Sequence, residues 1–238
     1  MSISIPEHNY ILAALPRNAK NRIFHHLEPV KLKFGDVLHE PGGKIHNVFF
    51  LTTAIASLLN CTRDGSSAET AVVGREGMLG IGLLMGGNNP PVQTVILRTG
   101  DGFRLKARYL KEEFNRGGQM MHLLLCYMQG LMTQMSQVAV CNRHHSVSQQ
   151  LCRWLLMNLD RQPANSLVMT QELIAAMLGV RREGVTEAAG KLQRDGLIRY
   201  KRGHITVLDR VGLEARVCEC YQVVSSECAR LLPIAMAV

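Results

Sequence analysis

The fold of the C-terminal part of the chain is decided by the stretch QELIAAMLGVRREGVTEAAG, which occupies residues 171–190. Ala175 stands where two helices cross closely enough to need a small side chain. Gly179 follows four residues later, where a turn needs the left-handed backbone that glycine adopts at little cost. A small apolar core closes the pair of helices, and it consists of Ile174, Leu178 and Val185. This spacing predicts a helix-turn-helix.

A basic hairpin is predicted directly after this motif. Asp195 and Gly196 end the second helix, and residues 197–208 form two short β-rich runs that turn at Gly203. The turn is flanked by Lys201, Arg202 and His204. A helix-turn-helix followed by a hairpin is a winged helix.

The winged helix predicts binding to double-stranded DNA. The N-terminal half of its second helix is able to enter a major groove, where Arg matches guanine and Glu accepts from cytosine. The candidates for reading bases are Arg182, Glu183, Thr186 and Glu187. Phosphate contacts set the register without reading sequence, and the candidates for them are Thr170, Arg181, Lys191, Lys201, Arg202 and His204. The alternative is a small helical bundle with a solvated polar face.

The charge of the whole chain agrees with a polyanionic partner but does not locate it. The 238 residues carry a formal net charge of +8, and 47% of them are hydrophobic, which indicates a globular protein. The positive excess is divided evenly between residues 1–141 and 142–238. The placement of the basic residues on one helix start and one hairpin therefore marks the DNA-binding surface better than the sum does.

The N-terminal half has the pattern of an all-β roll or barrel. Twelve of the 21 glycines fall between Gly35 and Gly102. Between them lie short β-rich runs at residues 47–51, 71–73, 92–97 and 102–105. Residues 10–27 precede the roll with helical spacing, which Pro16 interrupts.

Residues 111–140 are predicted to be helical and to pair with a second chain. Apolar side chains recur in heptad steps of three and four, at Met121, Leu124, Met128, Leu131, Met135 and Val138. A second apolar row widens the face, so we expect one side to pack on the roll and the other to form a homodimer. The alternative is an ordinary buried core helix. A further helix is predicted at residues 147–159, with a loop at 160–165.

A membrane span is considered at residues 117–142, which contain no charged Lys, Arg, Asp or Glu and are long enough to cross a bilayer. Their glutamine side chains would lack partners in lipid, so a helix buried against a partner helix is favoured. We expect no membrane association, and the N-terminus has no secretory signal pattern. A cytoplasmic protein with reduced cysteines is expected.

This order of parts resembles the Crp/Fnr (cyclic-AMP receptor protein/fumarate-nitrate regulator) family over roughly residues 10–211. The most specific pieces are residues 35–38, 179–185 and 192–198. The resemblance implies an α+β protein with a cyclic-nucleotide-binding-like β-roll at residues 1–115 and a dimerisation helix and hinge at 116–142. A winged helix-turn-helix at 143–211 and a C-terminal helix at 212–238 complete the expected organisation.

The resemblance also implies a function. A Crp/Fnr protein is a homodimeric transcription regulator that binds a palindromic operator and works with RNA polymerase. Arg182 and Glu183 match the residues with which the family reads a G·C pair. Glu187 stands where the family often has Arg, so the sequence of the half-site stays open.

The effector cassette departs from the family pattern. The family uses Gly-Glu-Leu to hold ribose and a later Arg to hold the cyclic phosphate, whereas Met78 takes the Glu position and no Arg lies between Arg75 and Arg98. A buried phosphate would be left without a cation. We therefore expect no cofactor and no cyclic-AMP binding in the usual manner. Two interpretations are kept for one set of residues: they form an apolar effector pocket, or they merely fill the roll. The set consists of Gly77, Met78, Leu79, Gly80, Val92, Gln93 and Thr94.

No metal site is predicted. The chain lacks the N-terminal cysteine cluster of the iron–sulfur members of the family. His122 and Cys126 are four residues apart on the heptad helix, but core packing is the favoured interpretation. Cys218 and Cys220 fall in a helix predicted at residues 213–231, where residues two apart do not share a face. A redox role for Cys218, Cys220 and Cys228 stays open.

No enzyme motif is present, since the chain has no Gly-x-Ser-x-Gly elbow, no P-loop and no His-x-His pair. We expect a regulator and not an enzyme. Two alternatives are kept. One is a ligand-binding or metal-dependent β-roll enzyme whose helical tail mediates assembly. The other is a constitutive regulator whose roll is purely structural.

Overall fold

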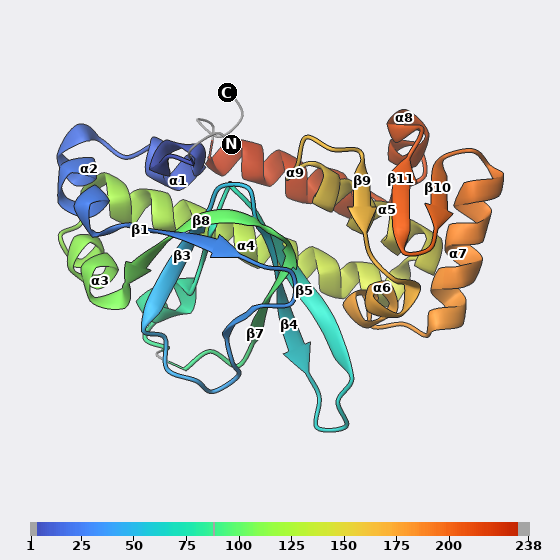
Figure 1. Cartoon of the computed structure of the whole chain (residues 1–238), viewed down its shortest axis with the longest axis horizontal. Coiled ribbons are helices and arrows are strands. Elements are labelled where there is room, and N and C mark those ends of the chain that lie inside the picture. Colours follow the sequence, from blue (N-terminus) through green and yellow to red (C-terminus); the bar gives the residue numbers. More distant parts are fainter. Residues whose placement is uncertain (1–3, 88, 233–238) are drawn as a thin grey trace. The chain divides into compact units, whose positions relative to one another are not determined.

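The computed structural model describes residues 4–87 and 89–232 (Figure 1). The chain divides into two compact units. The first holds the described residues of Met1–Leu58, Ala71–Thr133 and Glu227–Val238, and the second holds Leu59–Thr70 and Gln134–Ser226. Within the described residues, no helix is long and apolar enough to cross a membrane.

The β-roll predicted for the N-terminal half is confirmed. It consists of two four-stranded sheets with the strand orders β1-β8-β3-β6 and β2-β7-β4-β5. The strands are β1 (Glu28–Leu32), β2 (Val37–His39), β3 (Asn47–Leu51), β4 (Ile55–Cys61), β5 (Ser67–Val73), β6 (Met78–Leu79), β7 (Gln93–Arg98) and β8 (Gly100–Lys106). The residues of β4 and β5 from Leu59 to Thr70 belong to the second unit.

The strands β4 and β1 were not predicted, because neither has the regular alternation of apolar and polar residues that is typical of a strand. In β4, residues 55–59 are all buried, so no polar side chain marks a solvent face. In β1, Pro29 interrupts the pattern, and the strand lies at the edge of its sheet, where a missing backbone donor is tolerated.

Short helices precede and follow the roll. They are η1 (Pro6–His8), α1 (Tyr10–Ala13), α2 (Arg17–Ile23), η2 (Phe24–His26), η3 (Ile81–Met85) and α3 (Ala107–Asn115). The predicted interruption at Pro16 is confirmed, because Pro16 is the N-cap of α2. Figure 1 shows α1, α2 and α3 gathered at one end of the sheets, and α3 packs on β3 and β8.

The helix predicted over residues 111–140 is two helices, α3 and α4 (Gly118–His144). Gly117 and Gly118 have φ angles of 75° and 74°, and this left-handed backbone ends one helix and redirects the chain into the next. The helix α4 also continues past Asn142, so the break with the next helix falls at His145 and Ser146, later than the predicted hinge.

The buried side chain of Asn9 ties α1 to the roll. Its amide donates to the carbonyl oxygens of Leu51 at 2.9 Å and Gly77 at 2.7 Å. Its Oδ1 accepts from the backbone N–H groups of Ile11 and Leu12. All the bonding capacity of this buried amide is therefore used, which offsets the cost of its burial.

The second unit is built around α5 (Val147–Leu159), whose residues from Gln150 to Leu159 are all buried. It packs against α6 (Gln171–Leu178), α7 (Arg182–Arg194) and α8 (Arg210–Glu214). A three-stranded antiparallel sheet has the order β10-β11-β9, with β9 (Ser166–Val168), β10 (Ile198–Lys201) and β11 (His204–Val207). Ser146 begins α5 with a capping box to Gln149.

The single C-terminal helix predicted at residues 213–231 is wrong. The helix α8 ends at Glu214, and α9 (Glu219–Leu231) begins after a turn. Within this turn, Arg216 forms an ion pair with Asp195, and Cys218 becomes buried. These tertiary contacts outweigh the helical pattern of the local sequence.

We predict that acid will weaken the first unit through Glu113. This buried carboxylate accepts from Arg22 Nε at 2.8 Å and Nη2 at 2.6 Å, and these bonds hold the pKa of Glu113 below its usual value. The ionised carboxylate therefore stabilises the fold above the ordinary Glu pKa of about 4.3, and this contribution is lost as pH falls through the lowered pKa. Glu113→Gln will lower the free energy of unfolding at neutral pH in urea titrations.

The difference in the free energy of unfolding between Glu113→Gln and the wild type should shrink as the pH is lowered below about 4. The exposed neighbour Glu112 provides the control, because Glu112→Gln removes a charge but no such pair. A difference between wild type and Glu113→Gln that stays constant with pH would contradict this role.

Candidate nucleic-acid interface

The predicted helix-turn-helix is confirmed as α6, a tight turn and α7. Gly179 ends α6 with φ 65° and ψ 34°, the left-handed conformation that the spacing required. The side chain of Thr170 caps the other end of α6 by accepting from the N–H of Leu173 at 3.2 Å. The predicted core residues Ile174, Leu178 and Val185 are buried, and so is Ala175, which was expected at the helix crossing.

The helix α7 has one buried and one exposed side. The buried side consists of Val185, Ala188, Ala189 and Leu192. The exposed side carries the base-reading candidates Arg182, Glu183, Thr186 and Glu187, together with Lys191. Arg181 is exposed at the N-cap of the helix. The side chains expected to face DNA thus share one solvent-facing surface.

The hydroxyl of Thr186 is also engaged within the protein. It lies 2.8 Å from Gln171 Oε1 and 3.0 Å from the carbonyl oxygen of Arg182. This contact links α7 to the first turn of α6. Thr186 therefore holds the two helices together as well as facing solvent.

The wing turns where the sequence predicted. Lys201 pairs with His204 across the hairpin, which leaves Arg202 and Gly203 as a two-residue loop. Their φ angles are 49° and 78°, and two positive values in succession are typical of a type I′ turn. Arg202 is the one non-glycine with positive φ in the described part of the chain. This strained backbone holds a cation at the tip of the wing.

A groove of about 440 Å³ lies between the start of α6, the start of α7 and the wing. Its lining consists of Thr170, Gln171, Glu172, Arg182, Tyr200, Arg202 and Gly203. Three predicted DNA-contacting residues, Thr170, Arg182 and Arg202, thus meet from three separate elements. Arg181, Lys191, Lys201 and His204 do not line this groove, although all four are exposed.

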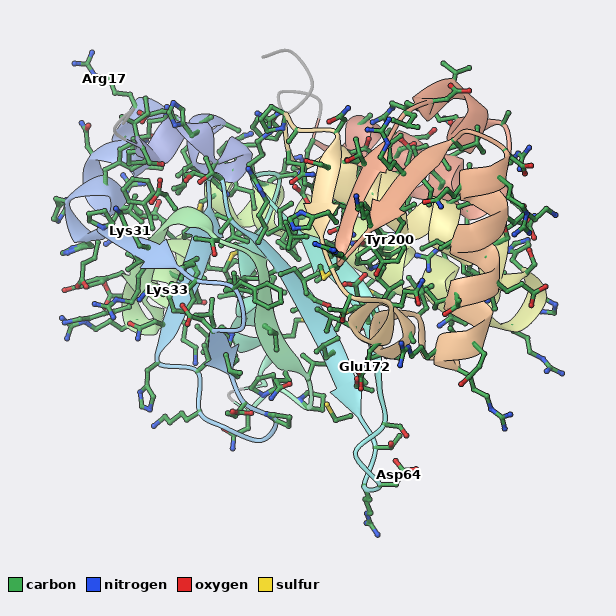
Figure 2. All side chains as sticks on the ribbon, turned by 45° about the vertical axis from the view of Figure 1, so that its right-hand side comes forward. Arg17, Lys31, Lys33, Asp64, Glu172 and Tyr200 are labelled. Carbon is green, nitrogen blue, oxygen red and sulfur yellow. The ribbon has the colours of Figure 1, made fainter. Side chains whose placement is uncertain are left out.

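Tyr200 is a groove residue that the sequence reasoning missed. Figure 2 labels it on β10, with Glu172 near the start of α6. Its hydroxyl donates to the carbonyl oxygen of Met169 at 2.9 Å, and burial raises its pKa. The alternation of buried and exposed residues along β10 puts Tyr200 on the same side as buried Ile198. That period of two was the signal available in the sequence.

The residues proposed as an effector pocket mostly fill the roll of the first unit. Met78 and Leu79 are each 1% exposed, so both faces of β6, which pairs with β3, are covered within the protein. Thr94 is buried as well, whereas Val92 and Gln93 are half-buried. Gln93 donates its amide to Glu40 at the surface, at 3.0 Å.

The space beside Gly77 is taken by Tyr127 of α4. A Cβ atom at position 77 would lie 2.5 Å from the tyrosine ring, so only glycine allows this approach. The hydroxyl of Tyr127 donates to the carbonyl oxygen of Met78 at 2.8 Å. Backbone groups of the cassette are therefore bonded within the protein.

The heptad seam of α4 divides into two sets. Leu124, Leu131 and Val138 are buried within the single chain, whereas Met121, Met128 and Met135 are partly exposed. Leu125 and Met132 are exposed to 44% and 55%. At about 100° per residue, the five exposed or partly exposed side chains fall within an arc of about 80°. We call this surface the α4 stripe; it consists of Met121, Leu125, Met128, Met132 and Met135.

His122 and Cys126 contact each other, with 3.7 Å between Nε2 and Sγ. Within the described residues, no third potential ligand joins them. The pair is a contact between two successive turns of one helix.

Comparisons with known proteins identify the class. Residues 149–216 match the Crp-like helix-turn-helix domain. A solved structure from Eubacterium rectale, assigned to the Crp/Fnr family of transcriptional regulators, is similar with a TM-score of 0.70 and 20% identity, covering 87% of this chain and 98% of that one. No curated protein sequence matches the chain.

Two further structures share the fold. FixK2 from Bradyrhizobium japonicum has a TM-score of 0.68 and 15% identity, covering 81% of this chain and 98% of its own. The c-di-GMP responsive global regulator CLP from Xanthomonas campestris has a TM-score of 0.65 and 15% identity, covering 81% and 99%.

The C-terminal part of the chain is therefore a helix-turn-helix domain of the Crp-like class, joined to a β-roll in the architecture of these regulators. The fold of the chain as a whole is that of these solved regulators.

We predict different effects for Arg182 and Lys201. Arg182→Ala will remove about 1–3 kcal/mol of discrimination at one base position, because a bidentate Arg–guanine pair is lost. Lys201→Ala will weaken binding to all sequences alike and reduce the salt slope by about one, because a phosphate contact is lost. Footprinting on a selected operator and its single-base variants measures both. Equal losses on every sequence for both variants would contradict the assigned roles.

Proposed function

We propose that the protein reads a palindromic operator as a homodimer and regulates transcription without the usual cyclic-AMP chemistry. The observation that carries this proposal is the groove that joins Thr170, Arg182 and Arg202 beside the exposed side of α7. Arg182 and Glu183 stand at the helix start, where a major groove is read, and the wing cations hold phosphates. Two copies about one DNA turn apart, roughly 34 Å, suit a two-fold symmetric site.

The α4 stripe supports a homodimer. Four methionines and one leucine form a continuous apolar surface on one side of a long helix, and methionine packs well against irregular partners. A second copy of α4 would cover this surface with the same residues, as a two-fold interface requires.

The contacts around Gly77 favour an effector other than cyclic AMP, or none. The Tyr127 ring occupies the space next to Gly77, and Met78 offers a buried thioether where a ribose acceptor would be needed. The same packing of Tyr127 and Met78 in the cassette also favours the alternative of a constitutive regulator whose roll is purely structural. The proposed role needs RNA polymerase as a partner and a cytoplasmic location, and it involves no enzymatic step.

We predict that Met132→Glu will convert the dimer to a monomer in sedimentation velocity. The carboxylate would be buried without a partner at the centre of the stripe. Affinity for a palindromic site should fall with it, because the second half-site is no longer held. Val211→Glu is the matched control, since Val211 is an exposed apolar residue outside the stripe. A dimeric Met132→Glu variant would refute the stripe as the interface.

Calorimetry with cyclic AMP is predicted to show no saturable heat for the wild-type chain. Tyr127→Phe serves as a control for the role of the ring, because this variant keeps the ring beside Gly77 and loses only the hydrogen bond to the carbonyl oxygen of Met78. Tight binding of cyclic AMP to the wild type would overturn this part of the proposal.

A further inference from the structure

Four potential metal ligands meet at the junction of α4 and α5 in the second unit. Cys141 lies in the last turn of α4, His145 directly follows that helix, and Cys218 and Cys220 flank the first residue of α9. Their ligand atoms all lie within 4.8 Å of one another. Within the described residues, this is the one group of three or more such side chains.

The distances fit the edges of a metal-centred tetrahedron. Cys141 Sγ lies 3.5 Å from Cys218 Sγ, and Cys220 Sγ lies 3.6 Å from His145 Nδ1. With Zn–S bonds of about 2.3 Å and Zn–N bonds of about 2.0–2.1 Å, a tetrahedral site has S···S edges of about 3.8 Å and S···N edges of about 3.6 Å. One ion at the centre would require only small adjustments.

The local structure explains how residues so spaced converge. The backbone N–H of His145 donates to the carbonyl oxygen of Cys141 at 3.0 Å, which continues the helical pattern and puts both side chains on one face. Cys218 precedes α9 and lies outside the helix, so the i, i+2 geometry of a helix does not separate it from Cys220. The prediction that Cys218 and Cys220 lie within one helix is therefore wrong.

The second nitrogen of His145 has the partner that metal sites usually provide. Nε2 lies 3.4 Å from Glu219 Oε1, which leaves Nδ1 directed toward Cys220. A histidine that binds a metal commonly donates its other N–H to a carboxylate, which fixes the ring and its tautomer. Gln150 also donates to the carbonyl oxygen of His145 at 2.9 Å and fixes the backbone there.

Arg153 supplies a charge that the cluster needs when a metal is bound. Its side chain is buried, and its Nε has no hydrogen-bond partner within the described part of the chain. Its positive charge acts on Cys141. Three thiolates around a divalent ion leave a net charge of about −1, and the buried guanidinium would neutralise it.

Burial and access indicate a structural site. Cys141, Cys218 and Cys220 are at most 3% exposed, and Val217 packs against them. Four protein ligands in a closed tetrahedron leave no open position for catalysis. Cys218 and Glu219 also line a surface pocket of about 310 Å³, which offers a path for an ion or a chelator.

We propose that Cys141, His145, Cys218 and Cys220 bind one Zn²⁺ ion, which fastens the start of α9 to the junction of α4 and α5. Thiolate and imidazole ligands in a tetrahedron favour zinc over the hard cations Mg²⁺ and Ca²⁺. Binding of the ion adds to the stability of the folded state. The proposal concerns metal binding and does not depend on the function proposed above.

The test measures metal in the full chain, purified under reducing conditions without chelator. Mass spectrometry of the elements should find about one zinc per chain, and replacement by Co²⁺ should give the thiolate charge-transfer and intense d–d absorption of a tetrahedral site. Cys141→Ser and Cys220→Ser should lower the zinc content at least about tenfold. Cys61→Ser removes an exposed thiol outside the cluster and should leave it unchanged.

A second measurement keeps the proposal testable if these variants fail to fold. A chelator added to the wild-type chain should lower its melting temperature, and re-added zinc should restore it. The proposal is overturned if the reduced wild-type chain binds no zinc or cobalt after reconstitution. It is equally overturned if peptide mapping shows that Cys141 and Cys218 form a disulfide in protein purified without oxidant.

Discussion

Gly77 is held between side chains of two helices that are far apart in the sequence. Asn9 donates to its carbonyl oxygen from the start of α1, and the Tyr127 ring of α4 lies against its bare Cα. Because the tyrosine also bonds to Met78, the rotation of α4 about its own axis is fixed at this point. Tyr127 and Met132 are about 140° apart around the helix, so seating the tyrosine on the roll turns the methionines outward. The packing of Tyr127 against Gly77 thus fills the cassette and also leaves the α4 stripe exposed.

The parts of the fold that follow from short-range rules could be predicted from the sequence. The left-handed turn at Gly179 and the hairpin turn at Gly203 depend on the positive φ that glycine adopts easily, and the break at Pro16 depends on the fixed φ and missing N–H of proline. The strand at residues 47–51 was also predicted with its observed bounds. In contrast, β4 is buried on both faces and has no alternation to detect, and the paired glycines at 117 and 118 divide a helix whose apolar pattern continues through the break.

The residues of the candidate sites also differ in whether local sequence patterns predict them. The exposed side of α7 follows from helical periodicity, so its residues were predicted together. The cysteine–histidine cluster joins residues 77 positions apart in the sequence, and it depends on a turn at residues 215–218 in which Arg216 pairs with the distant Asp195. No local sequence pattern predicts that ion pair. Long-range contacts of this kind decide both the end of α8 and the meeting of the thiols.

Under the proposed function, the two glutamates on the exposed side of α7 have a consequence for how the protein distributes itself on a chromosome. In the proposed complex Glu183 and Glu187 face a polyanion, so DNA repels them unless a cytosine amino group meets them. This repulsion weakens binding to the vast excess of unrelated DNA more than it weakens binding to the operator. Fewer molecules are then held at wrong sites, and a small number of copies per cell is enough to keep the operator occupied.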